Sequence, residues 1–167
     1  MTFVLGTGSL KELVGVHPTL VAVVHEALAI SNVDFGVHDG LRTEAEQLKY
    51  VRTGVSQTMN SKHRIQPDGF GHAVDLVPYI NGKLRWEWEP IYKIAAAMRD
   101  ALDRVNKQLA KDGKNPFKIR WGGCWKDLST IDRGPVAMMN AVEQYGKERR
   151  ALGKSVFTDG PHFEVLP

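Results

Sequence analysis

Two polar segments of this chain place histidine and acidic residues at spacings that suit metal binding and acid–base chemistry. The candidate residues are His63, His72, Asp75, Asp159 and His162. Zinc prefers imidazole and carboxylate ligands, and a catalytic zinc site keeps three protein ligands and one open position. Two histidines and one aspartate would leave the ion with a net charge of about +1, enough to acidify a bound water. A further carboxylate would then take the proton of that water.

Asp159 is the candidate for this further carboxylate. Side chains alternate between faces along extended backbone, so residues 159 and 162 can converge on one ion only across a turn. Gly160-Pro161 supplies such a turn. Residue types alone do not separate this arrangement from histidines in polar surface loops, which are more common. The order and spacing of the segments are what favour a metal site over surface histidines.

That order and spacing resemble a zinc peptidase family containing D-alanyl-D-alanine carboxypeptidases, phage L-alanyl-D-glutamate endopeptidases and the hedgehog signalling domain. The family pattern is S-x-H, then G-x-A-x-D, then (D/E)-x-x-H near the end. The matching segments are Ser61-Lys-His63, Gly71-His-Ala-Val-Asp75 and Asp159-Gly-Pro-His162. The resemblance implies that His63, Asp75 and His162 hold one zinc ion per chain and that Asp159 is the catalytic base.

Other residues extend the expected site. Gly40-Leu-Arg42-Thr resembles the family's G-x-R-(S/T) turn, whose arginine faces the metal. The implied role of Arg42 is to bind a substrate carboxylate or to stabilise the oxyanion; the alternative is a surface salt bridge ahead of a helix. Trp121 and Trp125 are candidates to line the cleft and contact sugar or peptide, although such aromatic residues are more often core. Ser61 is expected to bond near the metal, where such partners orient ligands.

The chain departs from the family pattern at three places. Seven residues lie between His63 and the G-x-A-x-D motif, more than in many relatives, so His72 competes with His63 as the ligand. We favour His63, because relatives carry varied residues where His72 stands. Cys124 replaces the aspartate of a G-G-D-W pattern, and no partner base marks it as a nucleophile. The segment that contains residues 134–153 is longer than in compact relatives, and we expect it to form an added helix that flanks the cleft.

The elements that must position these residues follow from local patterns. Pro18 begins a helix of regularly spaced apolar residues, and Thr43 with Glu46 forms a capping box for a helix that Gly54 ends. Further helices are expected at 89–111 and at 135–152 (interrupted by Gly146), strands at 34–38, 73–78, 117–121 and 162–165, and a loop at 55–72. Helices early and late, with strands near the polar motifs, favour an α+β fold. The resemblance implies a small antiparallel sheet that carries the zinc site between flanking helices.

Composition places the chain among ordinary globular domains. Of its 167 residues 43% are hydrophobic and 25% charged, so we expect one catalytic peptidase domain, 1–167, with no separate cell-wall-binding domain. The net charge of +3 is spread along the chain, with one dense cluster at 147–154 that is typical of a solvated face. We find no basic stripe with interleaved aromatic residues, and therefore expect no nucleic-acid partner. No apolar run is long enough for membrane insertion.

Three functions are compatible with the resemblance. A D,D-carboxypeptidase acts on wall precursors and normally needs an export signal, whereas the N-terminal segment lacks the basic and apolar parts of one. A zinc-stabilised binding module, as in hedgehog, would have no need of Asp159. We favour a phage L-alanyl-D-glutamate endopeptidase acting on bacterial peptidoglycan. We expect a monomer that stays in the host cytoplasm until a holin-type protein releases it to the cell wall.

Overall fold

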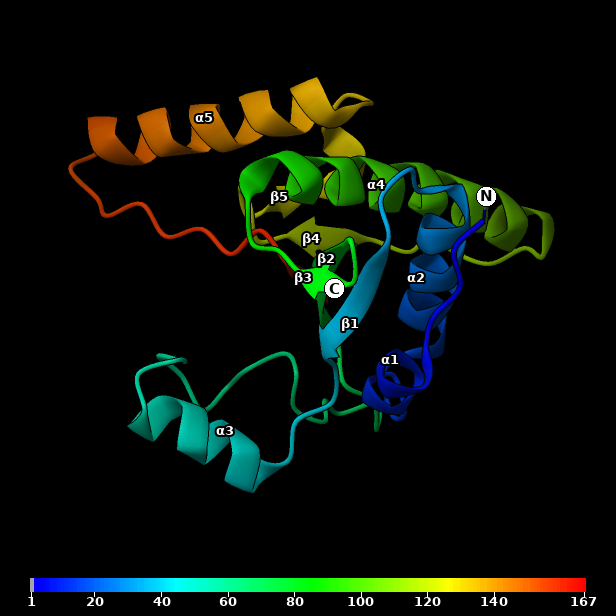
Figure 1. The fold of residues 1–167 in the computed structure, drawn as a ribbon, viewed down its shortest axis with the longest axis horizontal. Coiled ribbons are helices and arrows are strands. Elements are labelled where there is room, and N and C mark those ends of the chain that lie inside the picture. The colour runs from blue at the N-terminus through cyan, green and yellow to red at the C-terminus, as the bar shows by residue number, and fades with distance from the viewer. Residues whose placement is uncertain (1) are drawn as a thin grey trace.

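The computed structural model describes residues 2–167, which form a six-stranded sheet with helices around it (Figure 1). The strand order is β1-β2-β6-β4-β5, with β3 paired to β2 outside this path, and all these pairings are antiparallel. The strands are β1 (Phe35–Asp39), β2 (Ala73–Ile80), β3 (Lys83–Leu84), β4 (Ile119–Trp121), β5 (Lys126–Asp127) and β6 (His162–Val165). The helices are α1 (Thr7–Glu12), α2 (Pro18–Ile30), α3 (Glu44–Arg52), α4 (Trp88–Lys111), α5 (Pro135–Ala151) and the 3-10 turn η1 (Leu128–Thr130). The predicted α+β fold with a small antiparallel sheet is confirmed.

Strand β2 joins the sequence motifs because it lies between β1 and β6. Its register places Asp75 opposite His162 of β6 on one side and opposite Asp39 of β1 on the other. Side chains of directly paired residues lie on the same face of a sheet, about 5 Å apart at Cβ. Segments that are far apart in sequence therefore meet at one end of β2.

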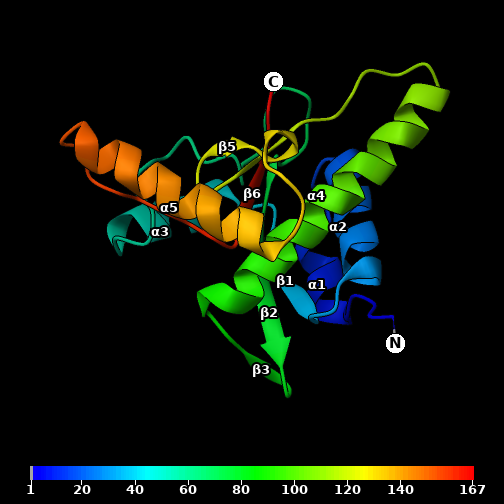
Figure 2. The same cartoon turned by 90° about the horizontal axis from the view of Figure 1, so that it is seen from above.

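A hydrophobic core fixes this arrangement. Helices α2 and α4 pack together beside the sheet (Figure 2). Their apolar faces join the strands in one cluster of buried side chains, including Leu20, Val24, Ile94, Met98 and Phe163. In this part of the chain, residues 2–167, no helix has the length and apolar character that crossing a membrane requires.

Local sequence signals account for the helix ends. Pro18 occupies the first turn of α2, as predicted. The capping box of α3 is complete, since the Thr43 hydroxyl accepts from the Glu46 N–H and the Glu46 carboxylate accepts from the Thr43 N–H. Gly113 follows α4 with a φ of 70°, a conformation that glycine adopts without strain.

Two expectations need correction. Helix α5 is continuous through Gly146, because one interior glycine costs only about 1 kcal/mol, too little to break a helix of 17 residues. The strand expected at 117–121 begins only at Ile119. The backbone N–H and C=O of Phe117 bond instead to the Asn106 side chain on α4, at 2.7 and 3.0 Å.

Candidate metal centre and cleft

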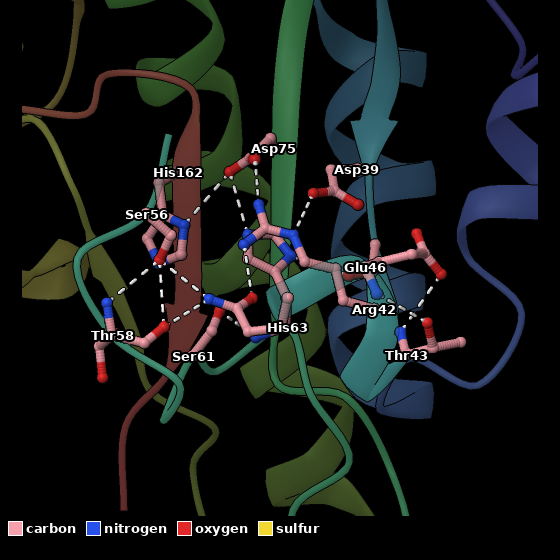
Figure 3. A network of polar contacts seen from close by, with 12 residues as sticks. Asp39, Arg42, Thr43, Glu46, Ser56, Thr58, Ser61, His63, Asp75 and His162 are labelled. Atoms are coloured by element: carbon pink, nitrogen blue, oxygen red, sulfur yellow. Dashed lines mark hydrogen bonds and ion pairs between the residues drawn. The ribbon is translucent and has the colours of Figure 1, made fainter. Parts of the chain in front are cut away.

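Three side chains from separate elements meet at the end of β2 (Figure 3). His63 comes from the loop before β2, Asp75 from β2 and His162 from the first position of β6. One ligand atom of each lies within 4.8 Å of the others. Asp75 Oδ1 is 3.3 Å from His63 Nε2 and 3.2 Å from His162 Nδ1. Tetrahedral ligands at zinc-like bond lengths stand about 3.3 Å apart, so the group can hold a metal ion.

The hydrogen bonds of His63 leave one ring nitrogen for a metal. Its Nδ1 lies 2.8 Å from the Gly40 carbonyl oxygen, which can only accept, so Nδ1 carries the proton and donates. In the neutral ring, Nε2 then presents a lone pair to the Asp75 carboxylate. This nitrogen is buried and has no hydrogen-bond partner among residues 2–167. Two acceptors that face each other at 3.3 Å require a cation or a proton between them.

His162 is oriented in a complementary way. Its Nε2 lies 2.9 Å from Glu164 Oε1, and Glu164 Oε2 accepts from Arg120 Nη2 at 2.7 Å. The Nε2 proton therefore goes to Glu164, and Nδ1 points at Asp75. A ligating histidine commonly donates its second ring proton to a carboxylate, which fixes its orientation. Glu164 therefore orients the His162 ring from the side opposite Asp75.

The charged groups at this centre perturb one another strongly when no metal is present. Burial lowers the pKa of His162, but the hydrogen bonds to Asp75 and Glu164 outweigh it and raise that pKa to about 10. Burial raises the pKa of Asp75, but His63 and His162 outweigh burial and hold it well below its ordinary value. The metal-free protein thus keeps a proton where a metal would bind.

A short turn holds Asp159 beside His162. The Asp159 N–H donates to the Gly122 carbonyl at 2.8 Å, and the His162 N–H donates to the Asp159 carbonyl at 3.0 Å. The turn predicted at Gly160-Pro161 is therefore present. Burial and the nearby Asp75 carboxylate raise the pKa of Asp159. A carboxyl group with a raised pKa is suited to exchange protons.

Gly122 lies against the Asp159 turn, at a position that the sequence motifs do not identify. A Cβ atom at this position would collide with the carbonyl oxygen of Asp159 and would lie 3.0 Å from the Cβ of His162. Only glycine lets β4 approach the Asp159 turn this closely. The Gly-Gly pair after Trp121 is the only trace of this requirement in the sequence.

Arg42 lies inside the site. Its Nε donates to Asp39 at 2.5 Å and its Nη1 to Gln47 at 3.0 Å, while Nη2 is 3.7 Å from Asp75 Oδ2. The guanidinium carbon stands 4.5 Å from the ring centre of Tyr50. Only 10% of the side chain is exposed, so the alternative of a surface salt bridge does not apply.

Gln47 on α3 is a second position without a motif. It is fully buried, and its amide nitrogen donates to Ser56 Oγ at 2.9 Å and to the Thr58 carbonyl at 2.5 Å. Its oxygen accepts from Arg42, so one amide links the arginine to the loop that follows α3. A glutamine on a helix is usually exposed, and nothing local marks this one as structural.

The structure separates the two competing histidines. The Ser61 hydroxyl accepts a hydrogen bond from the His63 N–H at 3.1 Å and so helps to fix the backbone of the loop that carries His63, called the ligand loop below. His72 points elsewhere: its Nε2 lies 2.7 Å from Asp68, and its ring packs edge-on against His17. The group of possible metal ligands, called the metal cluster below, consists of His63, Asp75 and His162 and does not include His72.

The two candidate tryptophans have different environments. Trp121 has no exposed surface and donates from Nε1 to the Gly160 carbonyl at 2.7 Å, so the expectation that it contacts substrate is corrected to a core position. Trp125 lines the cleft and lies 5.7 Å from the His162 ring, measured between centroids.

Cys124 is buried, and burial raises the pKa of its thiol, which disfavours the nucleophilic thiolate.

A cleft of about 360 Å³ opens in front of the metal cluster. One wall is the loop 54–63 together with Arg42, and the other carries Arg120, Trp125, Phe157, Asp159, His162 and Glu164. Helix α5 contributes no lining residue among those described. It packs on α4 and holds the returning segment through a hydrogen bond from Tyr145 to the Phe157 carbonyl, at 3.0 Å. The expected added helix exists, but it supports one wall from outside.

Fold and site define a class: α+β proteins in which two histidines and one aspartate that could hold a metal ion face a cleft that also holds an acidic residue. The chain belongs to the phage L-alanyl-D-glutamate peptidase family, which it matches over residues 1–166. It is 33% identical over 129 residues to the L-alanyl-D-glutamate peptidase of Escherichia phage T5, covering 75% of this chain and 83% of that protein. The crystal structure of the Serratia marcescens L-Ala D-Glu endopeptidase ChiX superposes with a TM-score of 0.65 at 33% identity, covering 98% of this chain and 90% of ChiX. The family resemblance noted in the sequence is confirmed.

Proposed function

We propose that this chain is a peptidoglycan endopeptidase that hydrolyses the L-alanyl–D-glutamate bond of bacterial cell-wall stem peptides. One observation carries the proposal: the ligand atoms of His63, Asp75 and His162 converge at a cleft that also holds the carboxyl group of Asp159. Membership of a peptidase family and similarity to two proteins named for this bond support the choice of substrate.

We propose zinc as the metal. Two imidazole nitrogens and one carboxylate oxygen form a ligand set that suits zinc, and three protein ligands leave a position open for catalysis. The fixed proton positions support this choice, since His63 offers Nε2 and His162 offers Nδ1. When bound, the ion supplies Lewis-acid chemistry and lowers the pKa of water.

The protein side chains divide the remaining tasks. Asp159 accepts a proton from the attacking water and passes it to the leaving amine, a dual role that suits a carboxyl group whose pKa is raised by burial. Arg42 directs Nη2 toward the metal cluster from the opposite wall and is placed to stabilise negative charge on the scissile carbonyl oxygen. Asp39 and Gln47 hold the guanidinium rigid, so little reorganisation is needed during the reaction.

The alternatives receive less support. A metal-stabilised binding module has no need of a buried carboxyl group beside an open cleft. The matching family and both relatives named above carry the name of the L-alanyl-D-glutamate bond and not of a D,D-carboxypeptidase. We propose that the chain acts as one catalytic domain, because a single core includes residues from Leu5 to Val165. A monomeric state, residence in the host cytoplasm and release by a holin-type protein stay predictions.

The test uses Asp159→Ala with Asp112→Ala as a control at the exposed end of α4. Purified muropeptides are digested and the products are identified by mass spectrometry, which separates cleavage between L-Ala and D-Glu from loss of a terminal D-Ala. Removing a general acid/base costs about 10²–10⁴-fold in rate, so Asp159→Ala should lose at least about 100-fold while keeping one metal per chain. Release of D-Ala alone by the wild type would refute the endopeptidase. Near-normal activity of Asp159→Ala would refute the assigned base.

A further inference from the structure

The proposed substrate carries a charged group that the metal centre does not explain. A glutamyl residue has two carboxyl groups, and only one of them can continue the peptide chain. The residue that supplies the scissile nitrogen therefore bears a second carboxyl group, two covalent bonds from that nitrogen when it is the α-carboxyl. Three cationic side chains line the cleft and are candidates to bind it: Arg42, Lys62 and Arg120.

The position of Asp159 fixes which wall this carboxylate faces. The leaving amine belongs to the glutamyl residue, and the proton it receives comes from Asp159. The backbone of Asp159 is bonded to Gly122, which follows β4, so the amine must lie against the wall formed by β4 and β6. Arg120 lies on β4, two residues before Gly122, and its side chain lines the same wall.

The side chain of Arg120 is prepared for a ligand. It is 37% exposed, its Nη2 donates to Glu164, and its guanidinium carbon lies 5.5 Å from the Trp125 ring centre. Its Nη1 makes no hydrogen bond among residues 2–167 and is the N–H group open to a ligand, whereas its Nε is buried there without a partner. The Glu164 carboxylate is shared with His162, so it compensates the arginine only in part. A planar guanidinium with free N–H groups matches a carboxylate.

The other two cations are less suitable. Arg42 is 10% exposed, already bonds Asp39 and Gln47, and stands on the opposite wall. Lys62 also belongs to that opposite wall, within the loop 54–63. Arg42 is near enough to Asp159 to oppose the rise in its pKa, but the Nε and Nη1 groups of this arginine are already bonded to Asp39 and Gln47.

We propose that Arg120 binds the free carboxylate of the D-glutamyl residue on the leaving side of the scissile bond and so determines specificity for it. This inference rests on the proposed endopeptidase function. Arg120 would thus pair with Glu164 through Nη2 and with the substrate carboxylate through Nη1, while its guanidinium lies over the Trp125 ring.

The experiment compares two synthetic stem peptides that differ in one group. One carries D-glutamate with its free carboxylate, and the other carries the corresponding carboxamide. Wild-type kcat/KM should favour the carboxylate by about 10- to 100-fold, the range expected for a charge-assisted pair. Arg120→Met should reduce this preference to near unity, by losing the carboxylate substrate and sparing the amide. Arg120→Lys keeps the charge but not the planar fork, and should retain part of the preference.

Metal content and thermal unfolding of each variant report whether the site is intact, and Arg120→Lys carries the test if Arg120→Met does not fold. Arg85→Met, which removes an exposed arginine paired with Glu87, should keep the full preference. Equal losses on both peptides would mean that Arg120 acts only by holding Glu164, and would overturn the inference. Loss of the preference in Lys62→Met instead would also overturn it. A wild type that cleaves neither peptide would refute the endopeptidase function itself, and this inference with it.

Discussion

Gly122→Ala tests whether the close approach of β4 to the Asp159 turn controls catalysis. The added methyl group would collide with the Asp159 carbonyl and crowd the Cβ of His162, so the turn has to move away from β4. Overpacking of this kind costs about 1–3 kcal/mol, while replacing glycine by alanine restrains the unfolded chain and returns about 0.4–1 kcal/mol. Steric cost should exceed the entropic gain because the clash involves backbone, which cannot rotate away. We expect a net loss of stability of about 1–2 kcal/mol.

The functional effect should be larger than the effect on stability. Asp159 and His162 belong to the same turn, so a shift displaces the proposed base and one proposed metal ligand together. A misplacement of about 1 Å can lower a rate by about 100-fold. Titration with zinc, kcat/KM on a muropeptide and thermal unfolding would be measured on one preparation. Gly8→Ala is the matched control, because a Cβ there meets nothing within 4 Å. Wild-type activity and metal affinity in Gly122→Ala would refute the requirement for close approach.

Three further predictions concern the metal ligands. Because the pKa of His162 is raised to about 10 without metal, zinc binding near pH 8 should release about one proton from this group, measured by calorimetry in buffers of different ionisation enthalpy. The same raised pKa stabilises the metal-free fold fully below pH 6.5, and this contribution should be lost as the pH rises toward 10; a pH-independent unfolding free energy across this interval would contradict it. His63→Ala should abolish zinc binding, whereas His72→Ala should leave most of it, as judged by metal content after dialysis. The reverse result would mean that the ligand loop is assigned wrongly.

The metal cluster could be anticipated from sequence because its residues fall in short motifs of characteristic types. The positioning residues could not, because their roles depend on pairings between distant segments. Glu164 reaches Arg120 only through the register between β6 and β4, across 44 positions of sequence. Gln47 and Gly122 likewise act through contacts that a local pattern does not encode.

The two tryptophans show the same limit at closer range. Trp121 and Trp125 are four residues apart and equally aromatic, yet one is buried in the core and the other lines the cleft. Trp121 ends β4, whereas Trp125 lies in the turn before β5, where its backbone has a positive φ of 57°. Helix α1 was not predicted from the sequence, because it has only six residues and no side-chain cap. It is held against β1 by a hydrogen bond from the Val37 N–H to the Ser9 hydroxyl. Such elements form only in tertiary context.

The geometry also explains which spacing in the motif is free to vary. His63 is fixed before the inserted loop by Ser61 and Gly40, and the chain is fixed again after the loop, where the Gly71 N–H donates to the Gly15 carbonyl at 2.9 Å. Residues between these anchors can lengthen without moving either ligand, since loop closure entropy grows slowly with length. The interval from Asp159 to His162 has no such freedom, because one turn sets the base against the ligand. The first spacing is therefore a weak family signal, and the D-x-x-H spacing is the one that fixes the proposed base against the proposed ligand.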